Sequence, residues 1–143
     1  ARDAMLIGMD LRKDAGVLER AYDDSQGITA AFNMNVLERV NRELRGDFDL
    51  GEFRHAARYD DVEGRVEMHL VSCKAQTAQV AVLGLEVEFA EGETIHTENS
   101  YKYGIGQIDD IARRAGWEVR RRWLDARQQF SVNLFAPVTT PGR

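Results

Sequence analysis

Covalent and metal cross-links are nearly excluded, because cysteine and histidine are scarce in this sequence. The 143 residues include one cysteine, Cys73, so no internal disulfide can form, which is typical of a reducing cytoplasm. The sequence supplies no obvious base that would activate Cys73 as a nucleophile. His55, His69 and His96 are scattered, and no two of them have a metal-ligand spacing. We therefore expect a cytoplasmic protein without a metal site.

Long apolar runs and excess positive charge are also missing. No run approaches the roughly 20 apolar residues that span a bilayer, and we expect no signal peptide. The net charge of −5 disfavours nucleic acid and anionic membranes as partners. The sequence contains neither a Gly-x-Ser-x-Gly elbow nor a phosphate-binding loop. What remains is the composition of an ordinary soluble protein, with a hydrophobic share of 43% that is enough for a core.

A polar stretch at residues 92–103 stands out from the rest of the chain. If it forms a strand, alternate side chains lie on opposite faces, and both faces are polar. One face then carries His96, Glu98, Ser100 and Lys102, and the other carries Thr97, Asn99 and Tyr101. A strand of this kind has no ordinary core role, so its side chains are expected to converge on something polar. The alternative is a solvated loop that leads into the next helix.

Residues 4–11 form a nearly continuous apolar run that ends in Asp10. Such runs are typical of a strand covered on both faces, as in a parallel α/β sheet. A parallel strand needs neighbours, and this run begins almost at residue 1. We therefore expect that one neighbour is missing and that the chain is a fragment.

Three helices are predicted in the next part of the chain. The first spans residues 14–23, and the second runs from a cap at Thr29 to about Leu44, where Gly46 ends it. Apolar residues spaced by four predict the buried face of the second helix, which comprises Phe32, Val36, Val40 and Leu44, with Leu37 alongside. A third, short helix is predicted for residues 50–58.

From Arg65 onward the sequence alternates as strands do. Val66, Met68 and Leu70 share one face of the first of these strands, and further strands are predicted at residues 78–83, 85–89, 117–123 and 130–135. A helix is predicted at residues 107–115, with Ile108, Ile111, Ala112 and Ala115 buried. Pro137 and Pro141 are expected in a mobile tail.

Short sequence blocks carry a resemblance to a known family. They are Asp-Leu-Arg-Lys-Asp (10–14), Ala-Tyr-Asp-Asp (21–24), Gly-Ile-Thr-Ala-Ala-Phe-Asn (27–33), Asn-Arg-Glu-Leu (41–44), Asp-Phe-Asp (47–49), Glu-Met-His-Leu-Val-Ser (67–72), Gly-Glu-Thr-Ile-His-Thr-Glu-Asn-Ser-Tyr-Lys-Tyr (92–103), Ala-Gly-Trp (115–117) and Trp-Leu-Asp (123–125). In this order they closely resemble the C-terminal part of the histidine-specific S-adenosylmethionine-dependent methyltransferases. Members of that family make Nα-trimethylhistidine (hercynine) for ergothioneine biosynthesis.

The resemblance implies an α/β fold in which a partial Rossmann-like methyltransferase sheet, its last three strands, carries an inserted α+β substrate-binding domain. Residues 1–12 and 103–137 would form the C-terminal half of the methyltransferase domain. Residues 13–102 would form the substrate-binding domain, and residues 138–143 a flexible tail. The family's glycine-rich cofactor loop would lie upstream of this chain, so the S-adenosylmethionine site would be mostly absent from it.

By the same resemblance, Tyr22, Met68, Glu98 and Ser100 bind the substrate. Tyr22 would hydrogen-bond the histidine carboxylate, Met68 would pack beside the imidazole, Glu98 would accept an imidazole N–H, and Ser100 would support the same ring edge. The residue types suit these roles, because a carboxylate satisfies an imidazole donor strongly and a thioether fills irregular space beside a flat ring. Each also has a plainer interpretation, with Tyr22 and Met68 as core residues and Glu98 and Ser100 as surface residues.

The resemblance therefore implies a histidine Nα-methyltransferase fragment that is inactive alone, with no catalytic base of its own. Two alternatives stay open. The chain is either a non-catalytic binding or interaction module, or it belongs to a family member that acts on another amino acid, such as tryptophan or tyrosine. As a fragment with a bare apolar strand, it is expected to form a homo-oligomer.

Overall fold

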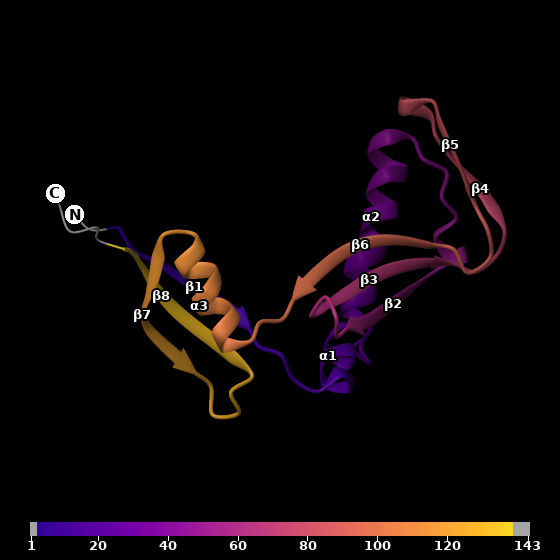
Figure 1. The fold of residues 1–143 in the computed structure, drawn as a ribbon. Helices are drawn as coiled ribbons and strands as arrows, with labels where there is room; N and C mark the ends of the chain where they lie inside the picture. Colours follow the sequence, from indigo (N-terminus) through magenta and orange to yellow (C-terminus); the bar gives the residue numbers. More distant parts are fainter. Residues whose placement is uncertain (1–2, 139–143) are drawn as a thin grey trace. The chain divides into compact units, whose positions relative to one another are not determined.

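A computed structural model of the chain describes residues 3–138, which divide into two compact units (Figure 1). Unit 1 joins the residues up to Asp14 to those from Tyr101 onward, and unit 2 is Ala15–Ser100. Each unit has a hydrophobic cluster of its own. None of the described helices is long and apolar enough to cross a membrane.

Unit 1 is a three-stranded antiparallel sheet with one helix packed against it. In order across the sheet, the strands are β1 (Met5–Asp10), β8 (Phe130–Pro137) and β7 (Trp117–Leu124), and β8 is antiparallel to both neighbours. Helix α3 (Ile105–Arg114) buries Ile108 and Ala112, which pack with Leu11 and Phe135. This small cluster holds the helix on the sheet.

The apolar run at residues 4–11 is a strand, as predicted, but β1 is not covered on both faces. Met5 is 40% exposed and Leu6 is 64% exposed. Within the described residues, β1 is an edge strand that pairs with β8 alone. Unit 1 therefore leaves part of the apolar surface of β1 exposed.

Two further expectations for unit 1 are corrected. Ile111 is 42% exposed and Ala115 is also exposed, because α3 has only its sheet-facing side covered. Pro137 is the last residue of β8 rather than part of a tail. A proline has no backbone N–H to donate to a neighbouring strand, and at the end of a strand this missing donor is tolerated. The predicted tail lies outside the described residues, apart from Val138.

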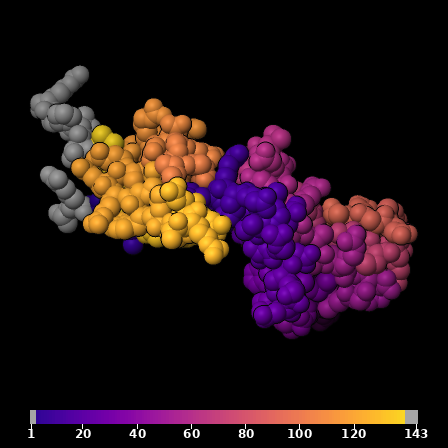
Figure 2. Space-filling model, turned by 90° about the horizontal axis from the view of Figure 1, so that it is seen from below, coloured from indigo at the N-terminus to yellow at the C-terminus, as the bar shows by residue number. Residues whose placement is uncertain are grey.

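Unit 2 consists of two helices packed against a three-stranded sheet, with a hairpin at its end. The helices are α1 (Ala15–Tyr22) and α2 (Ile28–Leu44), and the sheet order is β2 (Phe53–Asp60), β3 (Arg65–Ser72), β6 (Thr94–Tyr101). Strands β4 (Gln76–Val80) and β5 (Leu85–Phe89) form an antiparallel hairpin that turns through the 3-10 helix η2 (Ala81–Leu83). Helix α1, in indigo, faces the viewer in Figure 2. The core of the unit is Leu37, Phe48, Phe53, Leu70, Ala78, Val80 and Phe89.

The prediction of a helix at residues 50–58 is wrong. A 3-10 turn, η1 (Leu50–Glu52), leads directly into β2, which pairs antiparallel with β3 from Phe53 opposite Ser72 to Asp60 opposite Arg65. Phe53 is buried, whereas Arg54 and Arg58 are exposed. Pairing with a neighbouring strand overrides the local helix preference of the two central alanines.

Helix α2 is present as predicted, but it buries a different face. Asn33 and Leu37 are the buried residues, whereas Phe32 is 64% exposed and Val36 is 45% exposed. The amide of Asn33 donates to the backbone carbonyl of His69 at 3.1 Å. This buried polar contact fixes the rotation of α2 against the sheet and leaves half of the predicted apolar stripe outside.

The ends of α2 also differ from the prediction. Thr29 does not cap the helix, because the N-cap residue is Gly27, with a φ of 70° and no side-chain cap bond. The carboxylate of Asp24 accepts the Thr29 N–H at 2.8 Å instead, and this backbone bond is the main cause that lowers the pKa of Asp24 to about 2. At the other end Arg45, not Gly46, takes the left-handed C-cap conformation with a φ of 53°.

Candidate functional site

Most of the polar stretch is the edge strand β6 rather than a loop. The strict alternation predicted for it is not kept, because His96 Nε2 lies 2.8 Å from Asn99 Oδ1 although the two were assigned to opposite faces. Glu98 and Asn99 are both exposed, whereas Ile95 packs against the unit 2 core. His96, Glu98 and Asn99 therefore gather around one shallow pocket of about 160 Å³.

Tyr22 and Ser100, which are 78 positions apart in the sequence, meet in unit 2. The Tyr22 hydroxyl lies 2.6 Å from Ser100 Oγ, and either oxygen can be the donor. Both side chains are half-buried. The contact joins the last residue of α1 to β6, so two of the four predicted site residues share one hydrogen bond.

A polar network that sequence reasoning missed supports the end of α1. His55 Nε2 lies 2.8 Å from the backbone carbonyl of Tyr22, and His55 Nδ1 lies 3.0 Å from the Asn33 amide nitrogen. Because the carbonyl can only accept and the amide nitrogen can only donate, the ring carries its proton on Nε2. His55 and Asn33 thus hold the backbone of Tyr22 against the sheet. The only hint in the sequence was two polar residues within apolar patterns.

Met68 and Glu98 have different surroundings from this pair. Met68 is 3% exposed in β3, and its backbone carbonyl accepts a hydrogen bond from Thr97 Oγ1 at 2.9 Å. Glu98 is exposed, and within residues 3–138 its carboxylate makes no hydrogen bond or ion pair that would occupy it. No described hydrogen bond links Glu98 to Tyr22, Met68 or Ser100. A ligand in the pocket therefore meets a carboxylate that is ready to accept.

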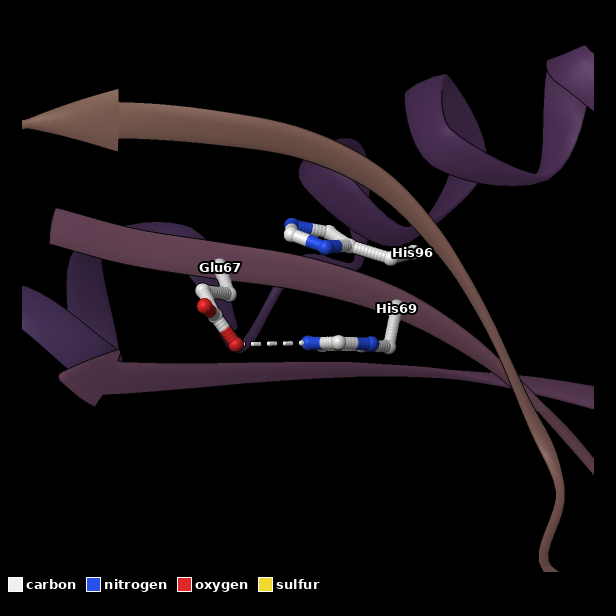
Figure 3. Close-up of side chains that lie close together, drawn as sticks. All are labelled: Glu67, His69 and His96. Carbon is white, nitrogen blue, oxygen red and sulfur yellow. Dashed lines mark hydrogen bonds and ion pairs between the residues drawn. The ribbon is translucent and has the colours of Figure 1, made fainter.

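Next to this pocket, Glu67, His69 and His96 lie close together (Figure 3), with candidate ligand atoms within 4.8 Å of one another. His69 Nε2 faces Glu67 Oε2 at 3.1 Å, so the carboxylate requires the ring proton there. The other ring nitrogen, Nδ1, is buried and has no hydrogen-bond partner among the described residues. The His69 and His96 rings stack with centroids 4.6 Å apart and an angle of 22° between their planes.

This cluster fits an ion-pair network better than a metal centre. Arg65 donates to one oxygen of Glu67 at 2.8 Å, and Arg58 donates to the other at 2.8 Å, so a cation would have to displace two guanidinium groups. Imidazole lone pairs lie in the ring planes, and two nearly parallel stacked rings do not direct them at one point. Hydrogen bonds from Arg65, then Arg58 and His69, lower the pKa of Glu67 to about 2.

Comparisons with known proteins give these residues a context. A family model described as "Histidine-specific methyltransferase, SAM-dependent" matches residues 1–137. The chain is 47% identical over 132 residues to a histidine N-alpha-methyltransferase of Mycolicibacterium smegmatis, covering 92% of this chain and 41% of that protein. It is 43% identical over 134 residues to the enzyme of that name from Mycobacterium tuberculosis, covering 94% and 42%.

An L-tryptophan methyltransferase of Psilocybe serbica is 31% identical over 135 residues, covering 91% of this chain and 36% of that protein. In each of these three comparisons the chain spans less than half of the length of its relative.

Proposed function

The chain belongs to the family of histidine-specific, S-adenosylmethionine-dependent methyltransferases, and from this premise we propose that it is part of a histidine Nα-methyltransferase. Its product would be the trimethylated amino acid hercynine, used in ergothioneine biosynthesis. Unit 2 is the substrate-binding domain in this proposal. The observation that carries it is the 2.6 Å contact between Tyr22 and Ser100, together with the exposed Glu98 two positions before Ser100 in β6.

The chemistry of these side chains suits histidine. A substrate carboxylate would take over the Tyr22 hydroxyl as its donor, and Ser100 would turn its own hydroxyl toward the imidazole edge. Glu98 would accept the imidazole N–H in a charge-assisted hydrogen bond, the stronger class of hydrogen bond. The thioether of Met68 would contribute through packing in β3 beside β6.

Tryptophan is the second candidate substrate, favoured by the 31% identity to a tryptophan methyltransferase. An indole also presents one N–H, so Glu98 does not exclude it. The shallow pocket at Glu98 is lined by four consecutive residues of β6, so its size does not separate an imidazole from an indole. Histidine is favoured over tryptophan because the two histidine methyltransferases are 47% and 43% identical to this chain.

The described residues do not by themselves fit S-adenosylmethionine, which supplies an electrophilic methyl group when bound. At the carboxyl end of β1, where a Rossmann-like sheet places its ligands, the Asp10 carboxylate is already paired with Lys13 and Lys102. The strand order β1-β8-β7, with β8 antiparallel to both, supports the proposal that unit 1 is the last part of such a sheet. The cofactor would then be held by residues outside this chain.

Titration calorimetry with the full-length protein tests the substrate assignment. Glu98→Ala removes a hydrogen bond to a charged group, so histidine binding should weaken roughly 10- to 150-fold. Glu88→Ala, an exposed glutamate of the β5 hairpin, is the matched control and should bind as the parent does. Unchanged histidine affinity in Glu98→Ala would show that the role given to Glu98 is wrong. If the unsubstituted protein binds tryptophan more tightly than histidine, tryptophan is the substrate instead of histidine.

A further inference from the structure

An apolar stripe runs along α2, and unit 2 covers only its C-terminal half, where Val40 and Leu44 pack against the core. We define the α2 stripe as Phe32, Val36, Val40 and Leu44. Phe32 is 64% exposed and Val36 is 45% exposed, and all four line a groove of about 390 Å³. Residues four apart share a helix face, so the stripe follows a line along which another helix can pack.

Two more exposed apolar side chains lie in the 3-10 turn near the end of the helix. The 3-10 turn η2 lies at the C-terminal end of α2, since the Ala81 N–H donates to the Arg45 carbonyl at 3.2 Å. In this turn Val82 is 56% exposed and Leu83 is 63% exposed. A surface of this kind on a folded unit is typical of an interaction site.

The charges around the groove favour an apolar occupant. Arg39 and Glu43 border the stripe and are paired with each other at 3.1 Å. The pKa of Arg39 is raised and that of Glu43 is lowered, in each case chiefly by the hydrogen bond to the other. Glu43 also pairs with Arg42 at 3.1 Å, so its carboxylate is satisfied by two guanidinium groups, and apolar side chains make up most of the groove lining.

We propose that the α2 stripe is the docking surface for the part of the same polypeptide that lies outside these 143 residues. The relatives carry more than half of their length outside the matched region, 59% in the case of the one that is 47% identical, since 41% of it is covered. A segment of the same chain is present at high effective concentration, so it covers such a groove before another molecule can. Unit 1 independently leaves Leu6 64% exposed, as a part of a larger protein would.

Thiol labelling of the full-length protein tests this. Cys73 is replaced by serine so that each variant has one reporter, and Val36→Cys places a thiol in the middle of the stripe. Glu38→Cys is the matched control, because Glu38 is exposed on the same helix but does not line the groove. In the full-length protein, maleimide should label Val36→Cys about tenfold or more slowly than in the 143-residue chain, because the thiol is freed only when the covering segment opens. Glu38→Cys should label at the same rate in both.

Equal labelling of Val36→Cys in the two proteins would overturn the proposal. The proposal would also be overturned if Val36→Cys is protected from maleimide in the 143-residue chain and this protection disappears on dilution. A second copy of the chain would then be the occupant of the groove. Hydrogen exchange of the unsubstituted proteins is an independent measurement, and the amides of α2 should exchange more slowly in the full-length protein. Neither measurement requires catalysis, so the result does not depend on the substrate assigned above.

Discussion

Glu67 is a buried carboxylate whose charge the fold constrains. Its side chain is 5% exposed, yet it is ionised between Arg58 and Arg65 and beside His69. A buried carboxylate is tolerated only when its oxygens are satisfied, and here both are. These contacts join β2 to β3 on the face that carries the polar cluster beside the Glu98 pocket.

The titration of Glu67 should appear in the stability of the protein. Its pKa falls from 4.5 to about 2 on folding, so its stabilising contribution is complete above pH 4.5 and is lost as the pH drops toward 2. Glutamine resembles the protonated side chain, so Glu67→Gln should reduce the free energy of unfolding by about 1–3 kcal/mol at neutral pH. Urea unfolding across this range should show the gap between parent and variant closing as the pH falls. Glu63 is an exposed partner of Arg65, so the unfolding free energy of the control variant Glu63→Gln should be almost the same as that of the unsubstituted protein. If the difference for Glu67→Gln stays constant with pH, the lowered pKa of Glu67 is not the source of its stabilising contribution.

For the candidate site residues, the sequence could nominate side chains but could not predict their surroundings. Tyr22 and Ser100 were nominated from sequence blocks and do meet, but no periodicity specifies a contact across 78 positions. The alternation rule failed at Glu98 and Asn99, because it assumes a regular strand and β6 changes phase there. The support from Asn33 and His55 was invisible, since single polar residues in apolar patterns do not reveal their partners.

Among the elements, β1 and the segment that follows β6 are joined by a buried ion pair. The Lys102 side chain is 0% exposed, and its Nζ lies 3.0 Å from Asp10 Oδ2. Burial alone would raise the pKa of Asp10, but hydrogen bonds from Lys13 and Lys102 outweigh it and lower the pKa. Backbone bonds from Tyr103 N–H to the Asp10 carbonyl at 2.9 Å and from Arg12 N–H to the Tyr103 carbonyl at 3.1 Å run alongside.

Breaking this pair should destabilise unit 1. Lys102→Met keeps the side-chain length but removes the charge opposite Asp10, and should cost about 1–3 kcal/mol. The two tryptophans of the 143-residue chain, Trp117 and Trp123, both lie in β7, so tryptophan fluorescence of this chain reports the unfolding of unit 1. Asp10→Asn combined with Lys102→Met should cost less than the sum of the single changes, because partners are coupled. Strict additivity would mean that the pair contributes no mutual stabilisation.

The type of most elements could be predicted because their periods were clear. The alternation after Arg65 became β3, and the apolar run at the start became β1. The error at residues 50–58 arose where two adjacent alanines obscured a period of two. The rotation of α2 could not be predicted, since a four-residue stripe shows that a helix is amphipathic but not that its own domain covers the stripe.

At the scale of the whole molecule, each unit has a separate core. The unit 2 cluster, which includes Leu37, Phe53 and Leu70, lies entirely within Ala15–Ser100, and the Tyr22–Ser100 hydrogen bond ties the end of α1 to the last residue of that segment. A contiguous segment with its own core is expected to fold alone. Residues 15–100 expressed by themselves should therefore unfold cooperatively by circular dichroism and give dispersed amide resonances. A non-cooperative transition would mean that unit 2 depends on unit 1.

The edge of unit 1 bears on how the 143-residue chain associates. Among the described residues, β8 is the one strand that pairs with β1, the Tyr103 bond reaches only its last residue, and Leu6 in β1 is 64% exposed. An apolar edge with unpaired backbone groups recruits a second copy, so light scattering should give a mass above the 16.2 kDa of one chain. A charge on an edge strand opposes such pairing, and Leu6→Lys should therefore restore the monomer mass. Val62→Lys, at a 90% exposed position in the β2–β3 turn, should leave the assembly unchanged. A parent chain that stays monomeric at high micromolar concentration, with slowly exchanging amides in β1, would show that the edge is already covered within one chain.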